Sequence, residues 1–139
     1  MIVLDTNVVS ALMRREADPA VLRWLDSQPS ESMWISSITV FEIRFGLEIL
    51  VSGRRRRTLE EAFDAMLVED FEGRILSFDE ASAQEAGRIA AERRRIGRTI
   101  EIRDVQIAGV AIARKAALAT RNTRHFEDLG IALINPWTA

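Results

Sequence analysis

Hydrophobic residues occur along the chain in short runs, separated by longer segments with helical periodicity. Five runs have the length and apolar character of buried strands: Ile2–Leu4, Met33–Ile35, Arg74–Leu76, Leu118–Thr120 and Ala132–Ile134. The segments between them predict helices over Val8–Arg14, Pro19–Ser27, Thr39–Val51, Thr58–Phe71, Glu80–Ile96 and Ile102–Ala116, with a short one over Thr123–Asp128. Strands that alternate with helices pair in parallel, so we predict an α/β fold whose sheet is covered on both faces.

Several predicted boundaries carry local sequence signals. Asp18 followed by Pro19 is typical of a helix N-cap with proline at the first helical position. Gly97 ends a helix whose last turn, Arg93–Arg95, carries the positive charge that the helix dipole favours. The segment Asn135-Pro136-Trp137 stops the final strand.

Composition narrows the possible chemistry. The 139 residues, 47% hydrophobic and 29% charged, suit one globular domain rather than a disordered chain. Apolar runs stay well short of the roughly 20 residues of a membrane span, and residues 1–5 do not resemble a secretory signal, so we expect a cytoplasmic protein. Cysteine is absent and His125 is the only histidine, which excludes thiolate and histidine-rich zinc sites. A bound metal would therefore have oxygen ligands, which favours Mg²⁺ or Mn²⁺.

Three acidic residues are predicted to meet at one end of the sheet. Ligands of parallel α/β sheets bind beyond the carboxyl ends of the strands, and Asp5 directly follows the first strand. Glu42 lies in a helix so apolar that we expect it to be largely buried. Asp104 shares a helical face with buried-type residues, and the small residues Ala108, Gly109 and Ala111 allow close packing of that helix against the sheet, which would place Asp104 at the strand ends. Carboxylates gathered in this way raise one another's pKa unless a divalent ion neutralises them.

Each of these residues also has a purely structural interpretation. Asp5 is a suitable N-cap for the helix near Val8, Thr39-x-x-Glu42 matches a capping box, and Asp104 near a helix N-terminus is favoured by the dipole. Asn122 follows the fourth strand, where its amide oxygen can bind a metal-bound water or simply cap the next helix.

Arginine clusters are the second candidate feature, although the net charge of −2 does not indicate nucleic-acid binding. The run Arg54, Arg55, Arg56 and Arg57 opposes the dipole if it begins a helix, so it belongs in an exposed loop or requires an anionic partner such as a phosphate backbone. A solvated charge run is the alternative. We assign Arg93–Arg95 and Arg98 to helix-end stabilisation, and Trp24 and Trp34 to the core or an interface.

Four motifs together resemble a known family. The series is Ile2-Val3-Leu4-Asp5-Thr6-Asn7-Val8-Val9-Ser10, then Ser36-x-x-Thr39-Val40-x-Glu42, then Ile102-x-Asp104-x-x-Ile107-Ala108, then Ala119-Thr120-Arg121-Asn122. This order resembles PIN-domain ribonucleases and, more narrowly, the VapC toxins of toxin–antitoxin pairs. Asn135-Pro136-Trp137 and the basic run after Gly53 are similar to the FitB-like branch.

The resemblance implies a single PIN-like domain over residues 1–139, with an α/β/α architecture and a five-stranded parallel sheet in the order 3-2-1-4-5. It implies Mg²⁺- or Mn²⁺-dependent endoribonuclease activity, with Asp5, Glu42 and Asp104 as catalytic metal ligands and the hydroxyls of Thr6 and Thr120 beside them. Many members carry a fourth acid at the position of Asn122, which puts a second metal in doubt here. The family further implies a homodimer, and inhibition by a small antitoxin protein whose tail occupies the active-site groove.

Two other enzyme classes use an acid after the first strand, and both fit poorly. A haloacid-dehalogenase-like phosphatase requires a second acid where this chain has Asn7, and a receiver domain requires an acidic residue where the third strand ends at Leu76-Ser77. The non-enzymatic alternative is a degenerate PIN-like module that binds RNA or protein without cutting, and Asn122 is its main support. For the enzyme, hydrolysis by metal-activated water leaves a 5′-phosphate and a 3′-hydroxyl.

Overall fold

A central parallel sheet organises the chain, of which our computed structural model describes residues 1–139. Its strand order is β3-β2-β1-β4-β5, as the resemblance implied. The strands are β1 (Ile2–Leu4), β2 (Met33–Ser36), β3 (Ile75–Leu76), β4 (Ala117–Ala119) and β5 (Leu133–Ile134). In register, Leu4 at the end of β1 lies between Ile35 of β2 and Ala119 of β4. The carboxyl ends of the three central strands therefore meet at one edge.

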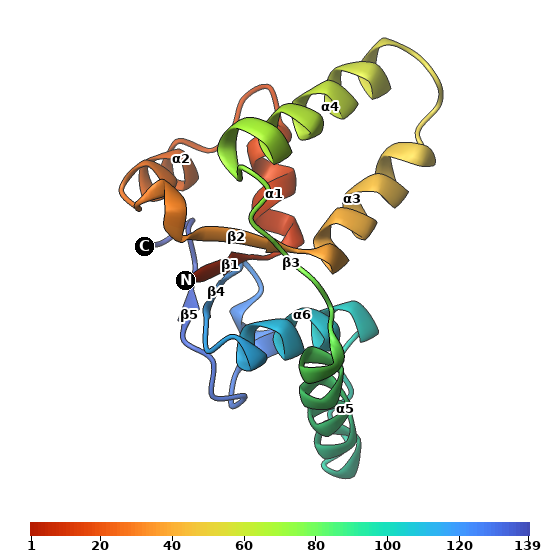
Figure 1. Cartoon of the computed structure of the whole chain (residues 1–139), viewed down its shortest axis with the longest axis vertical. Coiled ribbons are helices and arrows are strands. Elements are labelled where there is room, and N and C mark those ends of the chain that lie inside the picture. Colours follow the sequence, from red (N-terminus) through yellow and green to blue (C-terminus); the bar gives the residue numbers. More distant parts are fainter.

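Helices cover both faces of this sheet, so the predicted α/β/α layering is confirmed (Figure 1). The helices are α1 (Thr6–Met13), α2 (Pro19–Asp26), α3 (Ser37–Glu48), α4 (Arg54–Ala65), α5 (Glu80–Arg95) and α6 (Ile102–Ala113), with 3-10 turns at Ser30–Ser32 and Thr123–Phe126 and a π-helical turn at Met66–Asp70. The first four lie on one side of the sheet, and α5 and α6 lie on the other.

The side chains of β1 point alternately to the two faces of the sheet, and the core accordingly forms two clusters. Leu4 packs with Val8 of α1, Ile43 of α3 and Phe63 of α4, whereas its neighbour Val3 packs with the cluster formed by α5, α6 and the other face of the sheet. Successive side chains of a strand point to opposite faces, so adjacent residues serve different layers. None of the helices has the length and apolar character needed to cross a membrane.

Gly109 sets the spacing of the α5–α6 pair. A Cβ atom at this position would lie 2.5 Å from the carbonyl oxygen of Ser82 and 2.9 Å from the Cβ of Ala86. At Gly109 the predicted close packing is confirmed, but the close neighbour is α5 rather than the sheet, whereas Ala108 of the same helix belongs to the cluster that includes Val3 and Leu118 of the sheet.

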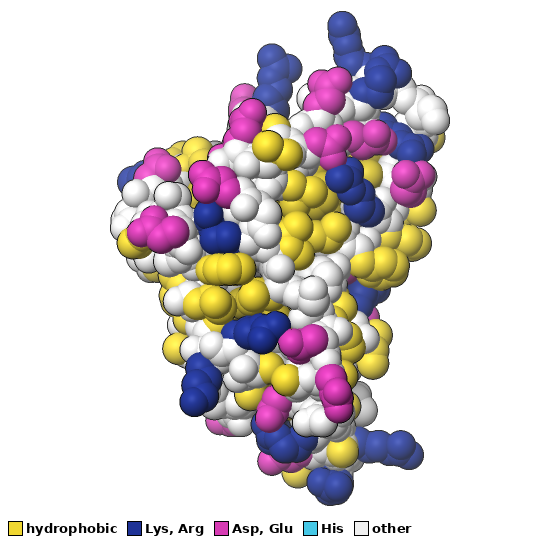
Figure 2. Space-filling model, in the orientation of Figure 1, with side chains coloured by type: hydrophobic (Ala, Val, Ile, Leu, Met, Phe, Trp, Pro, Cys, Tyr) yellow, Lys and Arg dark blue, Asp and Glu magenta, His cyan; other side chains and the backbone are white.

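Two predicted features of the α3–α4 hairpin were wrong. Helix α4 begins at Arg54 rather than Thr58, because Gly53 starts the helix and the arginines enter its first turn. Helix α3 was expected to be largely buried, yet Phe41, Phe45 and the C-cap residue Ile49 are more than half exposed. Figure 2 shows hydrophobic side chains gathered along and between these two helices. Part of the apolar circumference of α3 therefore packs in the core, and the rest is exposed on the surface of the molecule.

Candidate active site

Asp5 lies at the carboxyl end of β1, where the pairing of β1 with β4 brings it beside Thr120. The backbone N–H of Asp5 donates to the carbonyl of Ala119 at 2.9 Å. Its carboxylate accepts hydrogen bonds from the backbone N–H of Thr6 at 2.8 Å and from the Thr120 hydroxyl at 2.7 Å. Both hydrogen-bond donors hold the carboxylate in place. Asp5 thus caps α1, as its structural interpretation required, and still presents the carboxylate at the strand ends.

Burial dominates the electrostatics of Asp5, which is only 4% exposed. It raises the pKa of the carboxyl from 3.8 to about 6, against the opposing hydrogen bonds from Thr120 and Thr6. The negative charges of Asp104 and Glu42 raise the pKa further, to a smaller extent. The sequence predicted the direction of this shift from like charges, whereas the largest cause is the loss of solvent.

Glu42 comes from the second turn of α3 and reaches across to α1. Its Oε1 accepts a hydrogen bond from the Thr6 hydroxyl at 2.8 Å, and its Oε2 lies 3.8 Å from Nη1 of Arg103. Burial raises the pKa of this carboxyl, opposed by the Thr6 hydrogen bond and the Arg103 charge. The capping-box interpretation is wrong, because Ser36 caps α3 and accepts from the backbone N–H of Thr39. The Glu42 side chain is therefore available to the site.

Asp104 lies in the first turn of α6, and its carboxylate is turned toward His125. Glu101 is the residue that caps α6, since its carboxylate accepts the backbone N–H groups of Arg103 and Asp104. Oδ2 of Asp104 lies 3.0 Å from Nδ1 of His125, which follows β4. The Asp104 side chain is 21% exposed, so it borders the solvent rather than joining the buried stripe.

All three carboxylates line one hollow of about 890 Å³. The same hollow is lined by Asn7, Ser10, Arg14, Arg121, Asn122 and Trp137, among others. The three acids do not form a ready metal cluster, because no three Asp, Glu or His groups lie close enough to hold one ion. Glu42 is turned toward Thr6 and Asp104 toward His125. A shared ion requires these two side chains to leave their present partners.

Asn122 also borders this hollow, but it does not cap the following turn through its side chain. Its backbone is fixed by two 3.0 Å hydrogen bonds, one from its N–H to the Thr120 hydroxyl and one from the His125 N–H to its carbonyl, whereas its side chain forms none. The interpretation of Asn122 as a cap is therefore wrong. Its amide is available to the hollow, which is compatible with the metal-water role predicted from the sequence.

Sequence reasoning missed several groups that surround the acids. Arg103 lies beside Glu42, His125 holds Asp104, and the Arg121 guanidinium lies 4.9 Å from the ring centroid of Trp137. Arg103 adjoins Asp104 in sequence and Trp137 belongs to the Asn-Pro-Trp motif, so both stood close to recognised motifs. The pairing of His125 with Asp104 spans 21 residues and carries no sequence signal.

The basic run occupies the first turn of α4 and is only partly free to bind an external anion. Arg56 forms ion pairs with Glu48 at 2.8 Å and Glu60 at 2.6 Å. Arg54, Arg55 and Arg57 are exposed and form no ion pair. Of these, Arg55 lines a hollow of about 340 Å³ that also contains Glu42. The protein itself thus supplies the expected anionic partner of Arg56, and RNA binding by the others remains a prediction.

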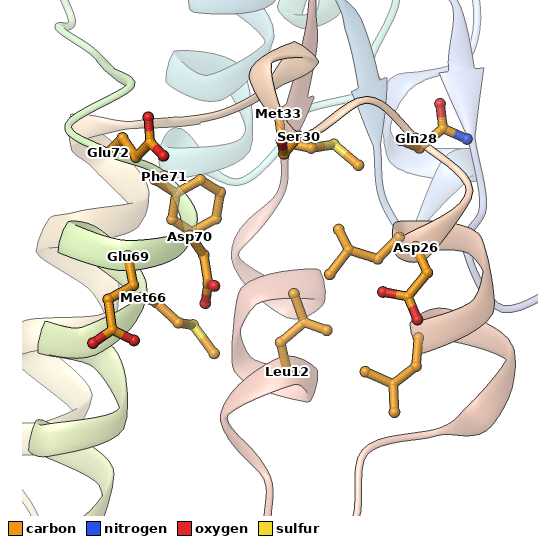
Figure 3. A pocket seen from close by; sticks show the side chains of 12 residues that line it. Leu12, Asp26, Gln28, Ser30, Met33, Met66, Glu69, Asp70, Phe71 and Glu72 are labelled. Atoms are coloured by element: carbon orange, nitrogen blue, oxygen red, sulfur yellow. The ribbon is translucent and has the colours of Figure 1, made fainter.

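A separate hollow of about 570 Å³ lies near the amino ends of β2 and β3 (Figure 3). Leu12, Met66 and Phe71 are among its apolar walls, and its acidic groups include Asp26 and Glu69. None of the three site carboxylates lines it. Its acids therefore provide controls for substitutions in the candidate active site.

Comparison with known proteins is consistent with this geometry. A family model described as the PIN domain matches residues 2–132. The VapC ribonuclease Y4jK of Sinorhizobium fredii is 40% identical over 137 residues, covering 99% of this chain and 98% of that protein. Toxin FitB of Neisseria gonorrhoeae is 37% identical and covers 99% of each chain. The crystal structure of FitAcB from N. gonorrhoeae superposes with a TM-score of 0.90 over the full length of both chains, at 37% identity.

Proposed function

This chain belongs to the PIN-domain family and, within it, to the VapC-type ribonuclease toxins of toxin–antitoxin systems, and we propose that Asp5, Glu42 and Asp104 are its catalytic carboxylates. The observation that carries the proposal is that these three side chains, from separate elements, line one hollow at the carboxyl ends of the strands. PIN nucleases are metal-dependent. The donors in this hollow are oxygens, so we propose Mg²⁺ or Mn²⁺ as the ion.

The electrostatics of Asp5 support a cation at this position. Its pKa of about 6 means that burial opposes the charge it carries at neutral pH, and a nearby divalent ion would favour that charge. Asp5 and Asp104 would hold the ion, and Glu42 would complete the ligand set or orient the attacking water. When bound, the ion would lower the pKa of a coordinated water and stabilise the negative charge that develops on the phosphodiester.

The surrounding residues position the carboxylates and the substrate. Thr120 and the Thr6 backbone hold Asp5, while the Thr6 hydroxyl holds Glu42. Arg14 and Arg121 line the same hollow and can bind phosphate oxygens of the RNA. Hydrolysis by water leaves a 5′-phosphate and a 3′-hydroxyl, so the RNA 2′-hydroxyl is not the nucleophile.

The assignment as a toxin also leads to proposals about the partners of the protein. We propose that residues 1–139 act as one nuclease unit, that the protein forms a homodimer, and that a small antitoxin inhibits it by inserting its tail into the active-site groove. Similarity to Toxin FitB over 99% of both chains supports the assignment as a toxin, on which these proposals depend. Growth arrest on expression, relieved when the neighbouring gene's product is co-expressed, tests it independently of the cleavage assay.

The test of the catalytic assignment is cleavage of single-stranded RNA by partner-free protein. We expect product with Mg²⁺ or Mn²⁺ and none with EDTA. Asp5→Asn and Asp104→Asn should each lower the rate at least about a hundredfold, the scale of several kcal/mol of lost charge stabilisation. Asp26→Asn is the matched control, because this exposed carboxylate lines the other hollow and should not affect the rate. Undiminished cleavage by folded Asp5→Asn and Asp104→Asn would refute the assignment.

Two observations favour a second candidate, a degenerate PIN-like module that binds RNA or protein without cutting. The hollow has Asn122 at the position where the family resemblance implies a fourth acid in many members, and Glu42 and Asp104 are turned toward Thr6 and His125 rather than toward a common ion. This candidate predicts RNA that is retained in a binding assay but yields no metal-dependent product. The same EDTA comparison separates it from the nuclease.

A further inference from the structure

A further small hollow adjoins the main hollow that contains the three carboxylates, and Asp104 lies between the two. Its volume is about 240 Å³, and Asp104 lines both hollows. Three arginines and His125 line it, against only two carboxylates, those of Glu101 and Asp104. The main hollow has the opposite balance, with five carboxylates and two arginines. The charged residues are thus mainly acidic in the main hollow and mainly basic in the small one, and Asp104 lies at the boundary between the two.

Two of the three arginines in the small hollow are free to bind an external anion. Arg98 and Arg124 are exposed, and neither forms an ion pair or a side-chain hydrogen bond within the chain. The third, Arg93, is buried and donates to the carbonyl of Glu127. The carboxylate of Glu101 is already occupied, since it caps α6 and lies 3.2 Å from Arg103. The available charge in this hollow is therefore positive.

The two free arginines are brought together by segments from different parts of the chain. Arg98 follows Gly97, whose φ of +71° turns the chain after α5, and its N–H donates to the carbonyl of Arg93 at 2.9 Å. Arg124 lies in the 3-10 turn after β4. The backbone of Arg98 thus helps to close the end of α5, as the sequence suggested, while its side chain lies beyond the C-cap, Ile96, and has no partner in the chain.

We infer that Arg98 and Arg124 form a subsite for the RNA phosphate adjacent to the one that is cleaved. This inference rests on the proposed function for the identity of the strand as RNA. A strand that presents its scissile phosphate to Asp104 in the acidic hollow continues past Asp104 into the basic one. Guanidinium groups bind phosphate oxygens with two parallel hydrogen bonds, and two of them from separate segments fix the position of the strand.

The first experiment measures binding without cleavage. Short oligouridylate is titrated in EDTA into the wild-type chain, into Arg98→Gln/Arg124→Gln, and into Arg94→Gln/Arg95→Gln. The last variant is the matched control, because Arg94 and Arg95 are exposed, carry the same charge and line neither hollow. We expect about tenfold weaker binding for Arg98→Gln/Arg124→Gln only, and a slope of log K against log[salt] that is smaller by about 0.7, the loss of one single-strand phosphate contact.

A second experiment locates the contact on the substrate. Once the cleavage site is mapped, two substrates each carry one neutral methylphosphonate, on the 5′ or the 3′ side of the scissile bond. We expect one of the two to raise the wild-type KM about tenfold with little change in kcat. The same substrate should not raise the KM of Arg98→Gln/Arg124→Gln further, because the interaction is already lost.

The outcomes separate this subsite from its rivals. Equal losses for the two double variants would mean general charge attraction and would overturn the subsite. Unchanged RNA binding together with weaker binding of the antitoxin would assign the arginines to an acidic protein segment and would equally overturn it. Since the first experiment uses no metal, failure of catalysis leaves its result intact, and the two proposals can fail separately.

Discussion

The hydroxyl of Thr120 donates a 2.7 Å hydrogen bond to Oδ2 of Asp5, joining residues 115 positions apart in the sequence. Parallel pairing of β1 with β4 creates this contact, because Leu4 and Ala119 are register partners and the next residue of each strand lies at the sheet edge. Burial raises the pKa of Asp5, and the Thr120 hydrogen bond is the largest influence that lowers it. A residue outside the acidic set thus helps to set the pH at which the site is charged.

Replacing Thr120 with Val should shift the acid limb of the pH–rate profile upward. The pKa of Asp5, about 6 with the hydrogen bond in place, rises when that bond is lost, so a smaller fraction of the carboxylate is ionised near pH 6. We expect activity to fall most at pH 6 and to recover above pH 8. Thr120→Ser keeps the hydroxyl and should retain the wild-type limb; a Val variant with the same limb as wild type would contradict this role.

Asp5→Asn should stabilise the fold at alkaline pH while abolishing activity. The folded-state pKa of about 6 exceeds the usual 3.8, so this group's contribution to stability is fully present below about pH 4 and is lost as the pH rises through 6. Two pKa units correspond to about 3 kcal/mol. We therefore expect urea unfolding in EDTA to show Asp5→Asn more stable than wild type at pH 8 by up to about 3 kcal/mol, with a smaller difference at pH 5.

The control for that measurement is Asp26→Asn, whose exposed carboxylate gives no reason for a pH-dependent difference. Added Mg²⁺ should raise the wild-type melting temperature and have less effect on Asp5→Asn, since ion binding to the folded state stabilises it. If Asp5→Asn proves no more stable than wild type at pH 8, the burial cost inferred for this carboxylate is wrong.

The sheet and the position of Asp5 could be predicted from the sequence because both depend on local patterns. The strand runs, their parallel pairing and the acid after the first strand follow from hydrophobic periodicity. The orientation of Glu42 could not be predicted in this way. The hydrogen bond from Thr6, 36 residues away in the sequence, determines it, and no local pattern distinguishes that contact from a capping box. Exposure of Phe41 and Phe45 was missed for a similar reason, since periodicity indicates an apolar face but not what covers it.

Asn122→Asp should increase the affinity of the site for its ion. The side chain of Asn122 borders the hollow without forming a cap, so a carboxylate there would add a fourth negative ligand group at little structural cost. We expect half-maximal cleavage at a lower Mg²⁺ concentration, by about tenfold, the size of effect typical of groups close to a metal. The measurement is a Mg²⁺ titration of cleavage; Asn122→Ser adds no charge and should not lower the requirement. An unchanged midpoint in the Asp variant would place Asn122 outside the ion's environment.

Within the basic run, Arg55 and Arg56 should have separable effects. Arg56 is held by Glu48 and Glu60, so Arg56→Gln removes two ion pairs and should lower the melting temperature with little change in RNA affinity. Arg55 forms no ion pair and lines the hollow that contains Glu42, so Arg55→Gln should weaken RNA binding and leave the melting temperature unchanged. Binding of oligouridylate in EDTA and thermal unfolding are measured on the same two samples. A loss of RNA affinity that is equal in both variants would show that the run acts as a diffuse charge, without the division of roles that the ion pairs of Arg56 imply.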